Sequence, residues 1–301
     1  MFKKWQGLLL VTPSILLVVV FVYGLIGQNI ATSFERSSTK TFAGNERVVA
    51  PGGFENYTSL LADQRYQDSL WNLLVLTAVF VGGTMLFGLI WAILLEKGVK
   101  GEGFFRSVYL FPMAVSFIAS GTVWKWLLSP GIGDNQAIGL NRLLIMMGMP
   151  ELQSRWWSDP GAFSMAAMAM PAVWQLSGYV MALFLAGFRG ISEDQREAAR
   201  MDGAGEWQIY RHVLFPQLSP IALSALIIIG HMSMKTFDLI YAIAGQNNVV
   251  ADVPATLMWV QLFQQKNAPQ AAANATILLL IVALVVIPYL VYTNKTEKDM
   301  R

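Results

Sequence analysis

Residues 190–220 read GISEDQREAARMDGAGEWQIYRHVLFPQLSP, a stretch whose charged part separates two long apolar runs. The two runs, residues 160–188 and 212–234, contain no Asp, Glu, Lys or Arg. Each is long enough to cross a bilayer as a helix, which needs about 20 mostly apolar residues. The stretch therefore predicts a loop outside the membrane that connects two membrane-spanning helices.

The loop itself should fold as two short helices. Ser192 precedes Gln195 by three residues, the spacing of a capping box at the start of a helix. Gly203 can adopt the left-handed conformation that commonly ends a helix. A second short helix is expected from Glu206.

Small residues lie among the charges of this loop, at Ala198, Ala199 and Ala204. Small side chains allow another backbone to approach closely. A solvated helix–turn–helix would carry the same charges, and the charges alone favour that alternative. The face of small residues favours a helix that docks onto a partner.

The rest of the chain repeats the alternation of apolar runs and charged connections. Of the 301 residues, 55% are hydrophobic and 13% are charged, and the mean hydropathy is +0.48. A soluble domain usually carries about 25% charged residues. A β-barrel would show shorter, alternating segments. The sequence thus predicts a single all-α transmembrane domain over residues 1–301, with six spans at about 8–30, 70–95, 107–128, 162–187, 217–243 and 271–293.

The distribution of Lys and Arg predicts the orientation. An even number of spans places both termini on one side. The termini and the connections on their side hold twelve Lys and Arg residues, whereas the longer loops on the other side hold seven. Positive charge concentrates on the cytoplasmic side of membrane proteins, so both termini are expected in the cytoplasm. The first apolar run is too long for the core of a signal peptide, so it is expected to be a retained helix.

Several classes of function find no support in the sequence. A net charge of +2 without a basic cluster argues against nucleic-acid binding, and the absence of Cys excludes thiolate chemistry. His231 has no companion ligand that would complete a metal site. Ser233 lies too close to His231 in the chain to form a catalytic pair, and no G-x-S-x-G motif occurs. The chain is therefore expected to be no enzyme, with no catalytic residue, no metal and no cofactor of its own.

The string EAARMDGAG at 197–205, followed by VLFP at 213–216, resembles the EAA loop of binding-protein-dependent ABC importer permeases. Three further strings are similar to the carbohydrate, MalF-like branch: LFPMAVSFIASGTVWKWLLSP at 110–130, GLNRLL at 139–144 and KTFDLIYAIAG at 235–245. The glycine-rich string that usually follows Gly245 in that branch is absent. The residues that match the motif are Glu197, Ala198, Ala199, Asp202, Gly203 and Ala204.

The resemblance implies a type I ABC importer permease fold and a role for residues 190–220, hereafter the coupling loop. Its first helix would sit in a cleft of a cytoplasmic ATPase through Glu197, Ala198, Ala199, Asp202 and Gly203. No G-x-x-x-x-G-K-[ST] phosphate loop occurs in the chain, so ATP and Mg²⁺ would be bound by partner subunits. The implied protein is a multi-pass inner-membrane permease that works by alternating access.

The resemblance also implies the partners. These are a second permease subunit, expected to form a heterodimer with this chain, two cytoplasmic ATP-binding subunits, an extracytoplasmic solute-binding protein and membrane lipid. The residues alone leave pairing with a second copy open.

Candidate substrate contacts lie in the fourth span, where Trp174, Gln175 and Tyr179 introduce polar and aromatic groups at membrane depth. Gln175 and Tyr179 are four residues apart and share a helix face. Packing between helices explains Gln175 and Tyr179 equally well. In the fifth span, Lys235 and Asp238 can pair on one face, either as a structural ion pair or as substrate ligands.

The expected solute is a sugar or a sugar-like neutral compound, because the six spans contain no Arg that would bind a phosphate ester. Permeases for a polyol, a glycerol phosphate ester or a polyamine remain alternatives. A secondary transporter or channel is a further alternative, although neither requires an EAA loop.

Overall fold

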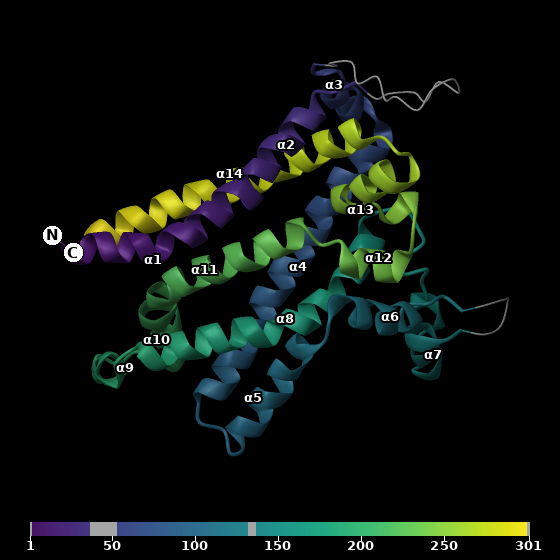
Figure 1. The fold of residues 1–301 in the computed structure, drawn as a ribbon. Helices are drawn as coiled ribbons and strands as arrows, with labels where there is room; N and C mark the ends of the chain where they lie inside the picture. The colour runs from purple at the N-terminus through teal and green to yellow at the C-terminus, as the bar shows by residue number, and fades with distance from the viewer. Residues whose placement is uncertain (1, 37–52, 132–136, 300–301) are drawn as a thin grey trace, which may run out of the picture. The chain divides into compact units, whose positions relative to one another are not determined.

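In the computed structural model, residues 2–36, 53–131 and 137–299 are described, and every regular element in these ranges is a helix (Figure 1). The chain divides into two compact units. The first contains Met1–Gln67 with Pro254–Ile281, and the second contains Asp68–Val253 with Val282–Arg301. The expectation of one domain over the whole chain stays a prediction.

The first unit joins helices from both ends of the sequence. Its elements are α1 (Phe2–Val18), the π-helical turn η1 (Val19–Tyr23), α2 (Gly24–Ser33), α3 (Glu55–Ala62), α13 (Pro254–Trp259), the π-helical turn η6 (Val260–Gln264) and the first part of α14 (Ala268–Asp299). The Nδ2 of Asn29 donates to the carbonyl of Ala272 and to the hydroxyl of Thr276, both at 3.2 Å. These bonds tie α2 to α14.

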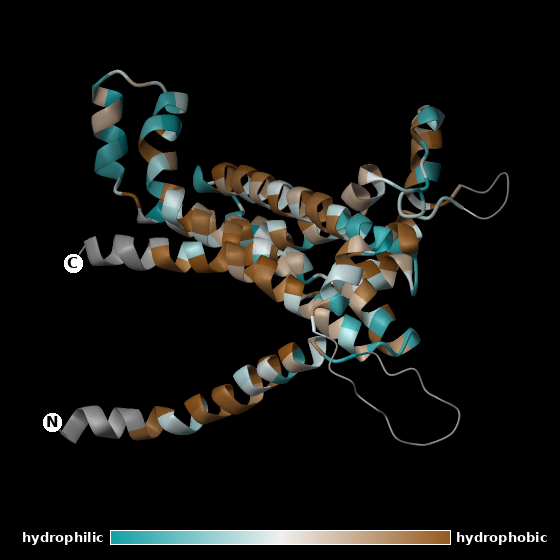
Figure 2. Cartoon of the chain, turned by 90° about the horizontal axis from the view of Figure 1, so that it is seen from above, coloured by the Kyte–Doolittle hydropathy of each residue, from teal (hydrophilic) through white to brown (hydrophobic). Residues whose placement is uncertain are grey.

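The second unit contains the coupling loop. Its elements are α4 (Gln64–Glu96, mostly in this unit), α5 (Glu102–Leu110), η2 (Phe111–Ala114), α6 (Phe117–Leu127), α7 (Gly139–Met146), η3 (Pro150–Leu152), α8 (Ala162–Gly190), α9 (Glu193–Met201), α10 (Glu206–Ile209), η4 (Tyr210–Leu214), α11 (Phe215–Met234), α12 (Asp238–Ala244) and η5 (Val249–Ala251). Figure 1 shows α8 and α11 running side by side, with α9 and α10 at the end where they connect. Figure 2 shows hydrophilic colours over α9 and α10.

Five helices in the described residues are long and apolar enough to cross a membrane. They are Leu9–Ser33, Gln64–Glu96, Ala162–Gly190, Glu206–Met234 and Ala268–Val291. A sixth span is present if the bent pair Glu102–Ala114 and Phe117–Leu127 is counted as one. The predicted all-α membrane fold is confirmed.

The third span differs from the continuous helix expected over 107–128. Its two halves meet at an angle of 96°. Pro112 lacks an amide hydrogen, Val115 is extended, and the hydroxyl of Ser116 accepts the amide of Ala119 at 3.2 Å to start a new helix. The apolar composition hid this bend, because no charged residue occurs between Ser107 and Trp124.

The fifth span also departs from the expected 217–243. It begins earlier, because α10 continues through the π-helical turn η4 into α11, and it ends at Met234. Near that end, the hydroxyls of Ser233 and Thr236 donate to the carbonyls of Gly230 and Met232, at 2.7 and 3.0 Å. Such side-chain bonds compete with the helical ladder. The chain therefore breaks before α12 starts at Asp238.

Close packing joins α4 and α5 to α8. A Cβ at Gly83 would lie 2.8 Å from Val173, and a Cβ at Gly88 would lie 2.6 Å from Val180. Glycine thus brings the backbones together at successive turns of α4. This contact fixes the frame from which the coupling loop extends.

Candidate functional site

The coupling loop forms the two predicted helices. The hydroxyl of Ser192 accepts the amide of Asp194 at 3.3 Å and caps α9. Gly203 has a φ of +84°, the left-handed conformation expected after the helix. The reciprocal capping bond expected from Gln195 is absent from the described contacts, because its side chain accepts from Nε2 of Gln217 in α11 at 2.7 Å.

The outer surface of the loop exposes apolar side chains that sequence reasoning missed. Met201 is 88% exposed and Trp207 is 67% exposed, although both are large and hydrophobic. Ala198 is also exposed, whereas Ala199 is half-buried. Large apolar side chains exposed on a charged loop are candidates for contact with a partner. The sequence did contain a signal for this surface, because Met201 and Trp207 are large apolar residues within an otherwise charged loop.

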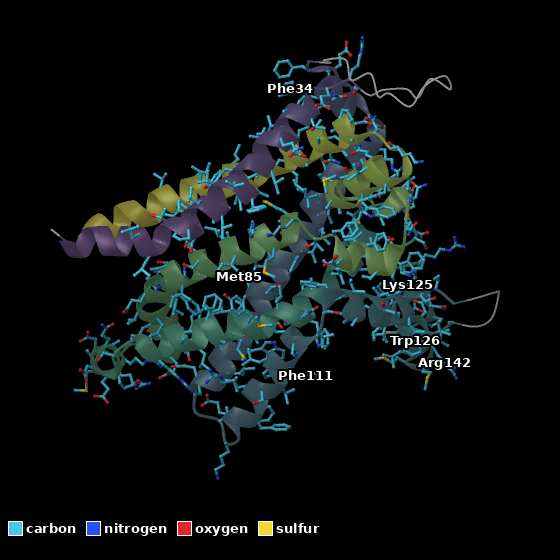
Figure 3. The ribbon with its side chains drawn as sticks, in the orientation of Figure 1. Phe34, Met85, Phe111, Lys125, Trp126 and Arg142 are labelled. Atoms are coloured by element: carbon cyan, nitrogen blue, oxygen red, sulfur yellow. The ribbon has the colours of Figure 1, made fainter. Side chains whose placement is uncertain are left out.

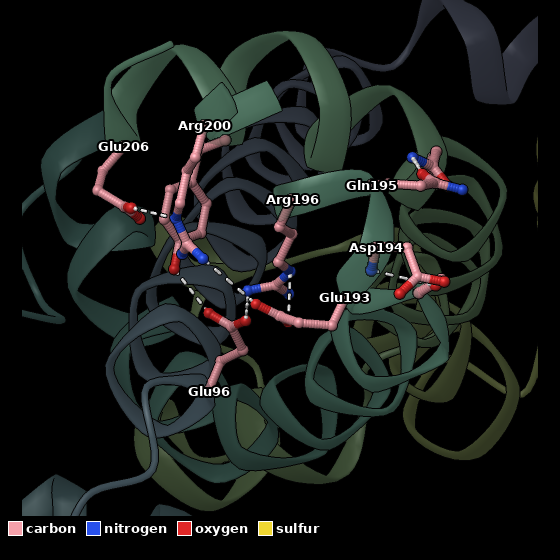
Figure 4. A network of polar contacts seen from close by, with 10 residues as sticks. Glu96, Glu193, Asp194, Gln195, Arg196, Arg200 and Glu206 are labelled. Carbon is pink, nitrogen blue, oxygen red and sulfur yellow. Dashed lines mark hydrogen bonds and ion pairs between the residues drawn. The ribbon is translucent and has the colours of Figure 1, made fainter. Parts of the chain in front are cut away.

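Ion pairs between charged residues connect the two helices of the loop (Figure 4). Arg200 pairs with Glu193 at 3.5 Å and with Glu206 at 3.1 Å, which links α9 to α10. The hydrogen bond to Glu206 and the charges of both carboxylates raise the pKa of Arg200 above its ordinary value. The guanidinium therefore stays charged. Through its contact with Glu206, it connects the helices on the two sides of the turn at Gly203.

A second set of contacts connects the loop to α4. Arg196 forms an ion pair with Glu96, the last residue of α4, and the hydroxyl of Tyr210 donates to the same carboxylate at 2.6 Å. The ammonium of Lys97 lies 5.9 Å from the centre of the Tyr210 ring. Sequence reasoning missed Glu96 and Arg196, because neither matches the EAA motif and they lie far apart in the chain.

An aromatic cavity of about 520 Å³ lies within the second unit, between α4, α5, η2, α6 and α8. Trp174 and Ser177 of α8 line it. The rings of Trp91 and Tyr109, also in its wall, stack with centroids 4.5 Å apart. No charged residue is among its described lining. Its size and apolar walls are typical of a site for a small ligand.

The other two candidates in α8 lie outside the lining of this cavity. Gln175 is 3% exposed, and its Nε2 donates to the carbonyl of Val115 at the bend of the third span. Tyr179 is half-buried. Of the three candidates, the structure thus brings only Trp174 into the cavity wall.

Lys235 and Asp238 do not form the ion pair expected on one helix face. Both are exposed, and no ion pair or hydrogen bond joins them in the described part of the chain. The break after Met234 removes the helical spacing that the pairing requires. Asp238 instead occupies the first turn of α12, where a carboxylate complements the helix dipole.

The end of the second unit farthest from α9 carries α6 and α7. Figure 3 shows Lys125 and Trp126 near the end of α6, with Arg142 on the neighbouring α7. A second cavity, of about 490 Å³, lies between these two helices. Among the described residues, no group of three or more His, Cys, Asp or Glu could hold a metal.

Comparisons with known proteins place the chain among transport proteins. Residues 84–295 match the family described as binding-protein-dependent transport system inner membrane component. The chain is 36% identical to the probable ABC transporter permease protein PH1215 of Pyrococcus horikoshii, over 97% of this chain and 96% of that protein. It is 32% identical to the xylose/arabinose import permease protein XacH of Haloferax volcanii, over 93% and 85% of the two chains.

A solved structure has the same fold. The chain is similar to one from a bacterial alginate ABC transporter in complex with an alginate pentasaccharide-bound periplasmic protein, with a TM-score of 0.74. The two are 18% identical, and the match covers 95% of this chain and 92% of the other.

Proposed function

The chain belongs to the family of binding-protein-dependent transport system inner membrane components, and from this premise we propose that it is the permease subunit of an ATP-driven sugar importer. The solute would be a neutral sugar or a sugar-like compound, such as an oligosaccharide or a glycoside. A separate ATPase would hydrolyse ATP, and this chain would carry out no bond chemistry. The solute would cross by alternating access.

The observation that carries the proposal is the geometry of the coupling loop. A capped helix, α9, is followed by a glycine at positive φ and presents exposed apolar groups in a charged surface. This arrangement suits docking onto a soluble partner. The residues proposed for the contact are those of the motif, Glu197, Ala198, Ala199, Asp202 and Gly203, joined by Met201 and Trp207.

The aromatic cavity supports the choice of solute. Indole and phenol rings offer flat apolar faces with polar edges, which suit a sugar ring that has apolar faces and peripheral hydroxyls. The wall contains Trp174, Trp91 and Tyr109, and its described residues carry no charge. A phosphate ester or a polyamine would call for opposite charges there. The name of XacH supports the same class of solute.

Tyr179, Lys235 and Asp238 remain proposed as further residues of the substrate path, and Gln175 is proposed to border that path by holding the bend of the third span. Gln175 and Tyr179 lie on the helix that contributes Trp174 to the cavity wall. Lys235 and Asp238 lie on either side of the break between α11 and α12, and both are exposed.

We propose the partners on the same basis. They are a second, different permease subunit, two cytoplasmic ATP-binding subunits that bind ATP and Mg²⁺, and an extracytoplasmic solute-binding protein. The periplasmic protein in the alginate transporter complex supports the last of these. The excess of Lys and Arg on the side of the coupling loop supports cytoplasmic termini.

Reconstitution tests the proposal. The chain is co-expressed with the candidate permease and ATPase, purified through a tag on this chain and placed in proteoliposomes. An ATPase should co-purify, and its activity should rise with the solute-binding protein and one of a panel of di- and oligosaccharides and small polyol glycosides. Solute flux down a gradient without ATP, and no retained ATPase, would support a secondary transporter or channel instead.

A further inference from the structure

The side chain of Glu96 contacts two elements of the coupling loop at once (Figure 4). Its carboxylate forms an ion pair with Arg196 of α9, and it accepts a hydrogen bond of 2.6 Å from Tyr210 of η4. The side chains of Glu96 and Arg196 are only 7% and 12% exposed. One carboxylate therefore joins the end of a membrane helix to both parts of the loop.

Burial distinguishes this ion pair from the others in the loop. The side chains of Arg200 and of its partners Glu193 and Glu206 are all more than 40% exposed. Water and salt screen pairs of that kind. The pair between Glu96 and Arg196 is shielded, so the loss of Glu96 leaves Arg196 only its 3.5 Å contact with the exposed Glu193. Of the ion pairs that α9 forms in the described residues, only this one reaches α4.

The ion pair attaches α9 to α4, in addition to the hydrogen bond from Gln217 of α11 to Gln195 and the ion pair between Arg200 and Glu206 of α10. The backbone at Ile191 joins α9 to α8, and Glu96 joins it to α4. The two membrane helices pack closely, through Gly88 against Val180. Without this attachment α9 can shift relative to α4, whereas a helix held by both α4 and α8 keeps its direction relative to them.

We propose, on the basis of the proposed function, that Glu96 is a positioning residue that fixes the direction of α9 relative to α4. The ATPase displaces α9 when it closes, and the attachment carries that displacement into the membrane helices. Without it, α9 still binds the ATPase through its exposed face but turns in place when displaced. ATP hydrolysis then continues while less solute moves for each ATP.

The test measures uptake and ATP hydrolysis on the same proteoliposomes, which contain the full importer. A mixture of radiolabelled xylose, arabinose, glucose and maltose serves as the probe. Glu96→Gln should retain the ATPase at the wild-type yield and lower the sugar carried per ATP about tenfold, within the usual range of coupling between sites. The double variant Glu96→Arg with Arg196→Glu restores opposite charges and should recover most of the ratio.

The chain offers a matched control. Arg189 of α8 and Glu102 of α5 also form an ion pair, at 2.5 Å, but they are more exposed and lie outside α9. Glu102→Gln should leave the sugar carried per ATP unchanged.

Two results for Glu96→Gln would overturn the proposal. One is an unchanged ratio of sugar to ATP. The other is a fall in hydrolysis in step with a loss of retained ATPase, because Glu96 would then support assembly and not direction. If this variant fails to insert, Tyr210→Phe removes only a hydroxyl and should lower the ratio to a smaller extent; an unchanged ratio there also overturns the proposal. If the wild-type chain retains no ATPase on purification, the proposed function is wrong, and this inference then loses its premise.

Discussion

Gly178 of α8 lies against the backbone of Tyr109 in α5, so closely that a Cβ on residue 178 would overlap the carbonyl oxygen of Tyr109. The atom in contact belongs to backbone, which cannot turn away as a side chain can. The fit between α5 and α8 therefore depends on glycine at this position.

Gly178→Ala should destabilise the protein by about 1–3 kcal/mol, the usual cost of overpacking. The measurement is the temperature at which half of the detergent-purified protein is lost from the monodisperse peak. Gly82→Ala is the control, because a Cβ at Gly82 of α4 meets nothing within 4 Å. Equal melting temperatures for both variants and the wild type would show that α5 can move away from residue 178 with little loss of stability.

Gly203→Val should abolish ATP-driven uptake while membrane insertion stays normal. Residue 203 has a φ of +84°, which a β-branched residue adopts only with strain. The strain would change the angle between α9 and α10. Membrane abundance, retained ATPase and uptake are measured on one preparation. Gly190→Ala, at a position with open space and no positive φ, is the control. Normal uptake by Gly203→Val would mean that the turn tolerates a different geometry.

Trp174→Ala should weaken the apparent affinity for the solute by about twofold to twelvefold, because an aromatic contact contributes about 0.5–1.5 kcal/mol beyond buried area. Affinity is measured as the solute concentration for half-maximal uptake. Trp71→Ala is the control, since Trp71 is exposed and is not among the residues that line the cavity. If both variants keep the wild-type affinity, the solute does not stack on Trp174.

Gln175→Leu should act mainly on stability. The substitution removes the hydrogen bond to the carbonyl of Val115, which then lacks that donor at the bend of the third span. We expect a lower melting temperature with an unchanged apparent affinity. Weaker affinity at an unchanged melting temperature would place Gln175 in contact with the solute.

Asn72→Asp should destabilise the loop that contains η5. The Nδ2 of Asn72 donates to the carbonyls of Val250 and Asp252, at 3.0 and 2.9 Å. A carboxylate of the same shape cannot donate, and each lost bond costs about 0.5–1.5 kcal/mol. Limited proteolysis should cut residues 245–253 faster in the variant. Gln153→Glu changes an exposed amide that donates to one carbonyl, and it should leave the rate unchanged.

Local features of the coupling loop were predictable from the sequence. The cap at Ser192 and the left-handed Gly203 depend on a few neighbouring residues, and the structure has both. The membrane helices were predictable because long apolar runs are a strong signal. These features need no knowledge of distant contacts.

Features that depend on distant contacts were not predictable. Glu96 and Arg196 are 100 positions apart, and nothing in their surroundings in the sequence links them. The cavity likewise assembles rings from several helices. The bend at Pro112 interrupts a run that contains no charged residue from 107 to 124, so hydropathy alone did not reveal it. The break after Met234 coincides with Lys235 and Asp238, which the sequence analysis interpreted as a pair on one continuous helix.

The exposure of Met201 and Trp207 has a consequence for how this protein can diverge. Both side chains point away from the packed interior, whereas Glu96 and Arg196 turn inward. If the proposed ATPase binds this face, substitutions on it can follow changes in the ATPase surface without repacking the permease. Under the proposed function, a duplicated copy of the gene could acquire a different ATPase through a few substitutions on the exposed face and keep its solute, because the residues proposed to bind the ATPase differ from those that pack the permease.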